Sequence, residues 1–345
     1  MSDKLRVAQV LAGAEHGGAE NFFVRLSVAL QASGQIDERA FIRRHGHRLD
    51  ALRSQGVDAE GFRFGGGLDF YDSWVYRRRL NNFNPDVVMT WMGRASAATP
   101  KGDYVLVNRL GHYYKLKYYQ QADYWVGISK GICRHLIEGG MPEDRVVHIP
   151  NFADEAPVEP LPRDSFNTPA DVPLLLAAGR LHVNKGFDTL LRALVDVPDA
   201  FLWLAGSGPE EQSLKSLCTE LGLDQRVRFL GWRNDRGALL AACDVVAFPS
   251  RYEPFGTVTV DAWAAGRPLV AADAVGPAAY VENEVNGLLI PKDDADALAD
   301  ALSRMISDKA LAAKLVEGGR ASYEAQFTKA AFQRDSMAFY EKIVA

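Results

Sequence analysis

Residues 244–266 read Asp-Val-Val-Ala-Phe-Pro-Ser-Arg-Tyr-Glu-Pro-Phe-Gly-Thr-Val-Thr-Val-Asp-Ala-Trp-Ala-Ala-Gly. The apolar run 245–248 has the length and flanks of a buried parallel strand. Apolar residues then recur at helical spacing, which predicts a helix that begins near Pro254 or Phe255 and stops at Gly266. In open α/β sheets ligands bind at the carboxyl ends of strands, and a helix N-terminus there offers unpaired amides to an anion. The connecting loop is therefore a candidate ligand site.

Two acids, Glu253 and Asp261, frame this loop and the start of its helix. One interpretation makes them ordinary helix acids, because carboxylates near a helix N-terminus complement its dipole. The other makes them ligands for a polar substrate bound at the sheet edge. The stretch by itself leaves both interpretations open.

Length and composition indicate a soluble protein with two α/β domains. The chain has 345 residues, of which 48% are hydrophobic and 24% charged, and no apolar run reaches the roughly 18 residues of a membrane-spanning helix. The first apolar segment is too short for a signal peptide, so we expect a cytoplasmic protein. Three widely spaced cysteines predict reduced thiols and neither a disulfide framework nor a zinc site.

Charge differs between the two halves of the chain. The net charge is −5, but residues 1–155 carry 20 basic and 18 acidic residues, against 19 and 26 in the remainder. A mildly basic first half fits an anionic acceptor or a membrane surface. Basic clusters occur at 43–48 and 77–79, and without a recognisable nucleic-acid-binding motif they indicate solvated faces or acceptor contacts.

The N-terminus has its own strand, glycine loop and helix. A strand is expected at 6–11, followed by a loop with Gly17, Gly18 and Glu20 and a helix that ends near Gly34. Glycines allow a tight turn and a close approach of a ligand to the helix N-terminus. The loop lacks the Gly-x-Gly-x-x-Gly dinucleotide pattern, so NAD is not expected. A plain tight turn is the alternative.

Strands and helices alternate through the first half, which predicts a parallel doubly wound sheet. His112 follows one of these strands at its carboxyl end and is either a site residue or a solvated loop residue. The run 113–119 then packs four tyrosines and two lysines into seven residues, which suits a membrane interface, a glycan platform or a partly buried helix. The further expected strands are 39–43, 87–91, 104–108 and 124–128, with helices at 68–80 and 130–138.

A second α/β set begins with a strand at 174–178. The loop after it holds Gly179, Arg180 and Lys185 ahead of a helix, an arrangement that suits a diphosphate, since Arg offers a bidentate fork and Lys a point charge. The next strand, 201–205, turns at Gly206. Asp294-Ala-Asp296 opens an amphipathic helix, where Asp caps the N-terminus, and we assign it no metal.

Together these motifs resemble the retaining GT-B-fold glycosyltransferases of family 4, the glycosyl transferases group 1. Glu253 and Asp261 match its Glu-x7-Glu signature with Asp in second place, and residues 179–186 match its Gly-Arg-Leu-x3-Lys-Gly element. A departure is Ala279, where most relatives have an acid. The resemblance covers nearly the whole chain and is strongest over 174–291.

The resemblance implies an α/β, GT-B fold with two doubly wound Rossmann-like domains facing across a cleft. It implies an acceptor-binding domain at 1–155, a proline-rich linker at 156–172, a donor-binding domain at 173–328 and a final helix at 329–345 that packs back on the first domain.

The resemblance also implies roles for residues. Glu253 would hydrogen-bond the donor sugar and His112 would contact the donor, both as catalytic residues. The nucleotide-diphosphate part of the donor would meet a second set: Gly179, Arg180, Lys185, Gly206, Phe255, Gly256, Thr257 and, at the ribose, Asp261. Gly17, Gly18 and Glu20 would lie on the acceptor side.

The implied activity is retaining, metal-independent transfer of a hexose from a nucleotide-diphosphate sugar to a hydroxyl of a glycan or lipid-linked acceptor. The expected setting is bacterial envelope polysaccharide or lipopolysaccharide synthesis in the cytoplasm, with association at the inner face of the plasma membrane. We expect no cofactor and no nucleic-acid partner. The alternatives are a sugar-nucleotide 2-epimerase of the same fold and a non-catalytic nucleotide-sugar-binding protein.

Overall fold

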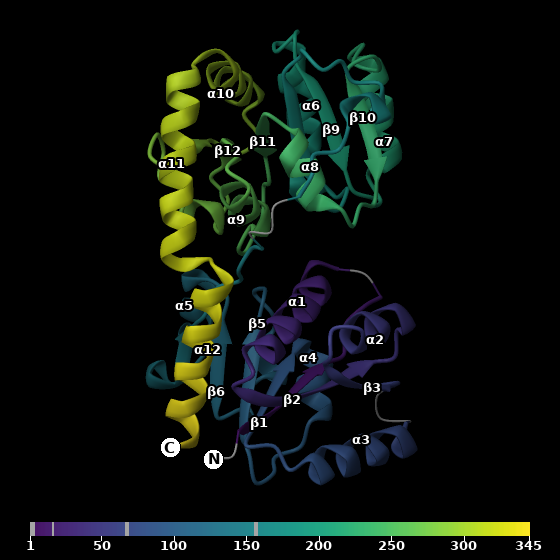
Figure 1. The fold of residues 1–345 in the computed structure, drawn as a ribbon, viewed down its shortest axis with the longest axis vertical. Helices are drawn as coiled ribbons and strands as arrows, with labels where there is room; N and C mark the ends of the chain where they lie inside the picture. The colour runs from purple at the N-terminus through teal and green to yellow at the C-terminus, as the bar shows by residue number, and fades with distance from the viewer. Residues whose placement is uncertain (1–3, 16, 66–68, 155–157) are drawn as a thin grey trace. The chain divides into compact units, whose positions relative to one another are not determined.

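The structure is a computed structural model that describes residues 4–15, 17–65, 69–154 and 158–345. It divides into two compact units, each with its own parallel sheet (Figure 1). Unit 1 consists of Met1–Asn151 and Lys329–Ala345, and unit 2 of Phe152–Thr328. The chain therefore leaves unit 1 for unit 2 and returns with its last helix.

Unit 1 contains a seven-stranded sheet in the order β3-β2-β1-β4-β5-β6-β7. The chain builds outward from β1 on one side and then reverses at β4 on the other. Its strands are β1 (Leu5–Leu11), β2 (Ile36–Arg43), β3 (Asp58–Phe62), β4 (Val87–Trp91), β5 (Val105–Leu110), β6 (Tyr124–Gly127) and β7 (Val146–His148). Its α-helices are α1 (Gly18–Ser33), α2 (Gly46–Arg53), α3 (Phe70–Phe83), α4 (Met92–Ala98), α5 (Lys130–Glu138) and α12 (Lys329–Val344), with 3-10 turns at Leu116–Tyr118 and Glu143–Arg145.

Unit 2 contains a six-stranded sheet in the order β10-β9-β8-β11-β12-β13, with the same reversal between β8 and β11. Its strands are β8 (Leu174–Ala178), β9 (Phe201–Ala205), β10 (Val227–Gly231), β11 (Val245–Phe248), β12 (Leu269–Ala272) and β13 (Leu288–Ile290). Its α-helices are α6 (Phe187–Val195), α7 (Glu211–Glu220), α8 (Arg236–Ala242), α9 (Thr257–Ala264), α10 (Ala295–Ser307) and α11 (Lys309–Gln326), with 3-10 turns at Arg163–Phe166, Val183–Lys185 and Pro277–Ala279.

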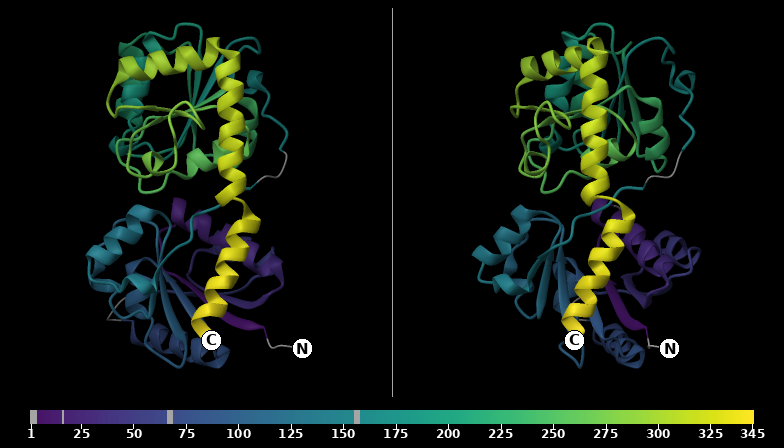
Figure 2. Two further views of the ribbon diagram at one scale, coloured as in Figure 1. Left: turned by 90° about the vertical axis from the view of Figure 1, so that its left-hand side faces the viewer. Right: turned by 60° about the vertical axis from the view of Figure 1, so that its left-hand side comes forward.

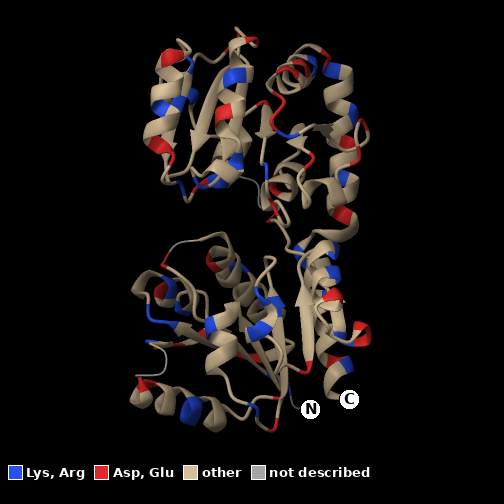
Figure 3. Ribbon diagram, turned by 180° about the vertical axis from the view of Figure 1, so that it is seen from behind, with Lys and Arg blue, Asp and Glu red and all other residues tan. Residues whose placement is uncertain are grey.

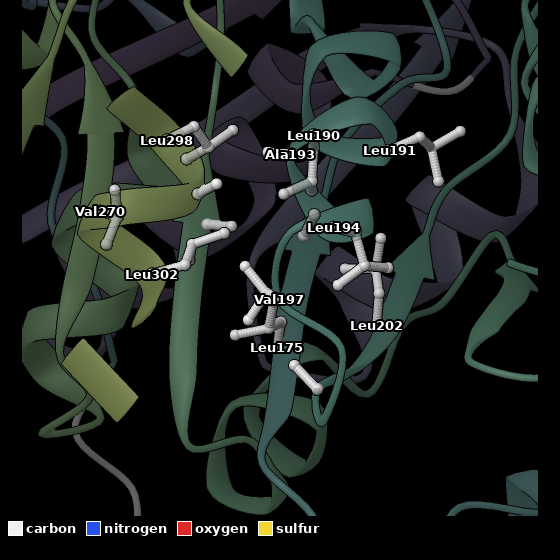
Figure 4. Close-up of a cluster of buried hydrophobic side chains, with 14 of the residues drawn as sticks. Leu175, Leu190, Leu191, Ala193, Leu194, Val197, Leu202, Val270, Leu298 and Leu302 are labelled. Carbon is white, nitrogen blue, oxygen red and sulfur yellow. The ribbon is translucent and has the colours of Figure 1, made fainter. Parts of the chain in front are cut away.

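The core of unit 2 shows why its strands are apolar along their whole length. Helices cover both faces of a parallel sheet, so alternate side chains are buried on opposite sides. On one side, α6 and α10 lie over the strands, and their leucines meet apolar strand residues (Figure 4). Leu175, Leu190, Leu202, Leu298 and Leu302 are fully buried there. This packing fixes where each strand ends, and so fixes the loops that follow.

The expected doubly wound architecture is confirmed in both sheets, and the differences lie at element ends. The helix expected at 68–80 is α3, which begins at Phe70, and Leu68 lies outside the described residues. The helix expected from Pro254 or Phe255 begins later, at Thr257, because Gly256 takes a left-handed conformation with φ of 85°. Sequence periodicity cannot show such a left-handed residue.

The last helix, α12, packs within unit 1 (Figure 2). Its Phe332 ring and those of Phe22 and Trp91 surround the Arg109 guanidinium, whose carbon is 5.3–5.7 Å from the three ring centres. Asn151 accepts a 2.9 Å hydrogen bond from this guanidinium. Burial lowers the pKa of Arg109 to about 10. Arg109, three residues before His112, thus forms a buried cation–π cluster with these three rings.

The segment expected as a linker, 156–172, begins with residues outside the described part of the chain. Its later part is fastened to unit 2. Arg163 donates to both carboxylate oxygens of Asp244 at 3.0 Å and to the carbonyl of Ala242 at 2.8 Å. A side chain with three such acceptors holds its backbone in place, so a free linker does not extend through Arg163.

A buried acid, Glu38 on β2, is expected to make the stability of unit 1 depend on pH. It is 3% exposed, and neither carboxylate oxygen has a hydrogen-bond partner in the described structure. Burial, the largest cause, raises the pKa of Glu38 well above its ordinary value. The folded protein therefore keeps a proton that the unfolded chain loses above about pH 4.3.

Stability should fall by up to about 1.4 kcal/mol per pH unit as the pH rises from that point toward the folded pKa. Glu38→Gln, which is neutral in both states, should raise the free energy of unfolding at pH 7 and remove this slope. Chemical denaturation between pH 5 and pH 8 measures it, with the exposed Glu341→Gln as the control. Equal pH slopes in wild type and Glu38→Gln would contradict the assignment.

Candidate active site

The two loops richest in predicted site residues flank the point at which the sheet of unit 2 reverses. One follows β8 and the other follows β11, and these strands are neighbours. At such a switch point, adjacent loops diverge to opposite faces of the sheet and leave room for a ligand. The predicted donor residues of unit 2 are thus brought to one sheet edge from separate parts of the sequence.

Glycines allow the loops at this edge to touch through their backbones. A Cβ on Gly206 would lie 1.8 Å from the Gly179 carbonyl oxygen, and a Cβ on Gly186 would lie 2.2 Å from that of Pro249. Neither contact can be relieved by a side-chain rotation, because the opposing atoms are backbone. The Gly179 amide also bonds to Ala205 at 2.9 Å. Glycine at 206 thus sets the spacing between the β8 and β9 loops, and glycine at 186 sets that between the β8 and β11 loops.

Lys185 and Glu253, one from each loop, form an ion pair. The Lys185 ammonium donates to Glu253 Oε2, and the two side chains are 22% and 16% exposed. The ammonium also lies 5.7 Å from the ring centre of Phe248. Their partial burial strengthens the attraction relative to a surface pair. The predicted phosphate-binding cation and the predicted sugar-binding acid therefore neutralise each other in this state.

Arg251 braces the same loop. Its guanidinium donates to both Asp188 oxygens, at 2.8 and 2.7 Å, and to the Val183 carbonyl at 2.7 Å. Burial of Asp188 opposes ionisation, but the hydrogen bonds and charge of Arg251 outweigh it and lower the pKa of that carboxyl. The Arg251 amide bonds to the Asn184 carbonyl at 2.8 Å. We did not predict Arg251 as a site residue from the sequence. The one sequence feature that could have indicated it is its position two residues before Glu253.

The N-terminus of α9 presents free amides beside this ion pair. Within the described structure, the backbone amides of Phe255, Gly256 and Thr257 donate no hydrogen bond. The Phe255 side chain is 3% exposed and packs 5.5 Å from the Tyr280 ring, so only its backbone is offered to a ligand. Tyr280 donates to the Gly256 carbonyl at 3.2 Å. The site thus combines free backbone amides with a paired ammonium and carboxylate.

Asp261 lies farther along α9 and already has a cationic neighbour. It is 7% exposed, and its Oδ2 is 2.9 Å from Arg236 Nη1 on α8, an ion pair without hydrogen-bond geometry. Arg236 was not a predicted site residue. A ribose contact by Asp261 would therefore form in the presence of this arginine.

Arg180 is exposed and forms no hydrogen bond or ion pair with any described residue. It is a free cation on the β8 loop and needs no rearrangement to meet an anion.

Among the described residues, no three His, Cys, Asp or Glu side chains cluster as metal ligands. Asp294 instead caps α10, where its Oδ1 accepts from the Ala297 amide at 2.9 Å. A pocket of about 450 Å³ lies at the opposite end of the strands, where β8, β11 and β12 begin, and residues such as Asp244 and Arg267 line it.

The predicted acceptor-side residues lie in unit 1 at the start of α1. Glu20 is 5% exposed, and its Oε1 accepts from the Ala14 amide at 2.8 Å. A Cβ on Gly17 would lie 2.1 Å from Glu20 Oε2, so the glycine loop closes over this carboxylate. No heavy atom of the described residues lies within 4 Å of the position that a Cβ on Gly18 would take. Of the three residues, Gly18 is the one open to a ligand, while Glu20 holds the loop.

Arg48 corrects one interpretation of the basic clusters. We expected 43–48 to be a solvated or acceptor-facing group, but Arg48 is 3% exposed and donates to the carbonyls of Ala14 and Glu15 at 2.9 and 2.8 Å. Burial lowers the pKa of Arg48, although Glu20 and Glu15 oppose this. The guanidinium supports the glycine loop from inside.

His112 lies in the turn after β5, where its carbonyl accepts from the Tyr114 amide at 2.9 Å and its ring lies 5.5 Å from that of Tyr114. It belongs to unit 1, so the structure of unit 2 does not bear on its predicted donor contact. The run 113–119 forms no α-helix. Tyr119 is 1% exposed, and only Leu116–Tyr118 turns as a 3-10 helix.

Two parallel α/β sheets of this topology form the GT-B fold, and solved structures agree. The Anabaena protein Alr3699/HepE in complex with UDP-glucose has a TM-score of 0.85 with this chain, at 23% identity and over 98% of this chain and 100% of that one. A glycosyltransferase from Rickettsia africae also has a TM-score of 0.85, at 20% identity and over 99% of each chain.

Sequence comparison gives the family. The family described as glycosyl transferases group 1 matches residues 160–322. LpsD of Rhizobium meliloti, a lipopolysaccharide core biosynthesis glycosyltransferase, is 35% identical over 99% of both chains. LpsE of the same organism, also a lipopolysaccharide core biosynthesis glycosyltransferase, is 35% identical over 91% of this chain and 93% of its own. The chain belongs to the glycosyl transferases group 1 and is a glycosyltransferase.

Proposed function

We propose that this glycosyltransferase moves a hexose from a nucleoside-diphosphate donor to a hydroxyl of a lipopolysaccharide core oligosaccharide, with retention of configuration. The observation that carries the proposal is the pairing of Lys185 with Glu253 beside the free amides of α9. A diphosphate carries negative charge, and a sugar carries hydroxyl donors, so the two members of the pair suit the two halves of one donor. The full-length relatives named for core biosynthesis support the acceptor class.

In this proposal the donor separates the pair. Lys185 turns to the diphosphate, joined by Arg180 and the amides of Phe255 and Gly256, while Glu253 accepts hydrogen bonds from sugar hydroxyls. Fixed donors aimed at a leaving group stabilise its developing charge, an effect of about 3–4 kcal/mol for one well-placed donor. These groups take the role that a metal has in other glycosyltransferases.

We further propose that the acceptor hydroxyl attacks from the side that the diphosphate leaves. The bond from the anomeric carbon to the phosphate oxygen breaks, the bond to the acceptor oxygen forms, and the hydroxyl proton passes to a phosphate oxygen. This path retains configuration without a nucleophilic side chain. His112 and Gly18 are proposed to act from unit 1, with His112 near the donor and Gly18 on the acceptor side, where Gly17 and Glu20 shape the loop that carries it.

Incubation of the purified protein with UDP-, GDP- and ADP-hexoses and a deacylated core oligosaccharide tests the proposal. We expect mass spectrometry to show one added hexose with at least one donor, and NMR of the product to show an α linkage from an α donor. Glu253→Gln serves as the control for a contaminating activity. Isomerisation of the donor sugar would indicate an epimerase, and donor binding without transfer a non-catalytic protein; either result would contradict the proposal.

A further inference from the structure

Helix α3 of unit 1 exposes three large aromatic side chains on one side. Phe70 is 76% exposed, Tyr71 77% and Trp74 55%. The rings of Tyr71 and Trp74 lie 6.3 Å apart. Adjacent exposed aromatics of this size are unusual on a soluble protein and mark a surface that contacts something else.

Helical geometry explains why this side is free. At 100° per residue, positions 70, 71, 74, 77 and 78 lie within a third of the helix circumference. The opposite side carries Tyr76, Leu80 and Phe83, which are 1%, 0% and 3% exposed. The helix has thus already buried its core-facing side against unit 1, and the exposed aromatics are not needed for that packing.

The same face is basic over its second and third turns. Arg77 and Arg78 follow Trp74 and are exposed, and the Arg78 guanidinium carbon lies 5.5 Å from the Trp74 ring centre. Arg79 points elsewhere and pairs with Glu60 at 3.4 Å. Positive charge therefore adjoins the aromatic rings directly.

Acids near α3 are turned away from this face. Basic and acidic residues are interspersed over both units (Figure 3). The acid on the first turn of α3, Asp72, is engaged by the backbone, because its Oδ2 accepts from the Arg63 amide at 2.8 Å and the Phe64 amide at 3.3 Å. Asp69 caps the helix by accepting from the Asp72 amide. Their carboxylates are engaged by the backbone, which leaves the aromatic and arginine side chains as the exposed chemistry.

We propose that this face of α3, formed by Phe70, Tyr71, Trp74, Arg77 and Arg78, docks on the surface of an anionic lipid bilayer. Tyrosine and tryptophan favour the boundary between headgroups and acyl chains, because one end of each ring system is apolar and the other polar. Arginine guanidinium groups bind lipid phosphates through two parallel hydrogen bonds. The proposal does not rest on the sugar chemistry of unit 2.

The tyrosine- and lysine-rich run 113–119 is the rival surface, because its composition also suggested membrane contact. Its aromatic rings are mostly used internally: Tyr119 is 1% exposed and stacks on Tyr114 at 5.9 Å. Tyr118 alone is strongly exposed, at 49%. Its two exposed lysines, Lys115 and Lys117, make it a charge-matched control within the same unit.

Co-sedimentation compares binding to phosphatidylcholine vesicles with binding to vesicles that also contain about 30% phosphatidylglycerol, a fraction that gives the surface a negative charge. The difference measures how much lipid charge contributes to binding. Arg77→Glu/Arg78→Glu should reduce the partition coefficient onto anionic vesicles at least roughly tenfold, since each basic residue near such a surface contributes about fivefold. Lys115→Glu/Lys117→Glu should reduce it much less. Equal losses in both double variants, or none in the α3 variant, would overturn the proposal.

Fluorescence locates the contact. Lipids brominated in their acyl chains should quench Trp74 on binding, and Trp74→Phe should keep most of the binding but lose most of the added quenching. An unchanged far-UV circular dichroism spectrum and thermal unfolding curve would show that each variant is folded. Unchanged nucleotide affinity, which reports on unit 2, would separate failure here from failure of the proposed donor site. Quenching that persists in Trp74→Phe would overturn a bilayer as the occupant. So would a protein that does not bind anionic vesicles and instead binds a soluble oligosaccharide or another protein through this face.

Discussion

Glu253→Gln is expected to lower kcat at least roughly tenfold while nucleoside-diphosphate affinity holds or rises. A hydrogen bond from a sugar hydroxyl to a carboxylate contributes about 1.5–3 kcal/mol, and more where it strengthens as the sugar gains positive charge. One decade in rate corresponds to 1.36 kcal/mol. Because Glu253 holds Lys185 in the free protein, its neutralisation also releases an ammonium for the diphosphate.

The control for this variant is Glu211→Gln. Glu211 is a first-turn acid of α7 in the same unit and pairs with Lys215, so it reports what a helix-dipole acid contributes. Such an acid contributes a few tenths of a kcal/mol to stability and nothing to turnover. Steady-state kinetics and isothermal calorimetry on both variants decide the matter. If Glu253→Gln turns over like Glu211→Gln, the carboxylate is a structural partner of Lys185 and has no role in transfer.

The strand, loop and helix at 244–266 show how much of the fold local sequence predicts. The apolar run became β11 with the same bounds, 245–248, because a strand buried on both faces must be apolar at every position. The doubly wound class followed from the alternation of such runs with helices. Short or polar elements were missed, among them β3 and α4, since neither has an apolar period long enough to recognise.

The candidate site was predictable in its parts but not in its pairings. The sequence indicated Lys185 and Glu253 separately, and only the adjacency of β8 and β11 brings them together. Arg236 beside Asp261, and Arg48 beneath the glycine loop, are contacts between residues from different elements. Side-chain type predicts that an arginine will bind carboxylates or carbonyls, but it does not predict which ones, because the partner depends on tertiary packing.

Lys185→Ala is expected to have the larger effect of the two cation replacements on this edge. It removes a charge from the diphosphate site and leaves the Glu253 carboxylate, which is 16% exposed, without its cation. That carboxylate would repel the diphosphate, so we expect the dissociation constant of a nucleoside diphosphate to rise between roughly tenfold and a hundredfold. The unpaired acid should also cost about 1–3 kcal/mol of stability.

Arg180→Ala is the matched variant, because Arg180 is exposed and contacts no acid in the described structure. It should weaken nucleotide binding by roughly tenfold and change stability by less than about 0.5 kcal/mol. Calorimetry and thermal unfolding on each variant separate binding from folding. In Lys185→Ala/Glu253→Gln the lost stability should return, because no charge remains unpaired, while donor affinity should recover only in part. An unchanged dissociation constant in both single variants would remove Arg180 and Lys185 from the diphosphate site.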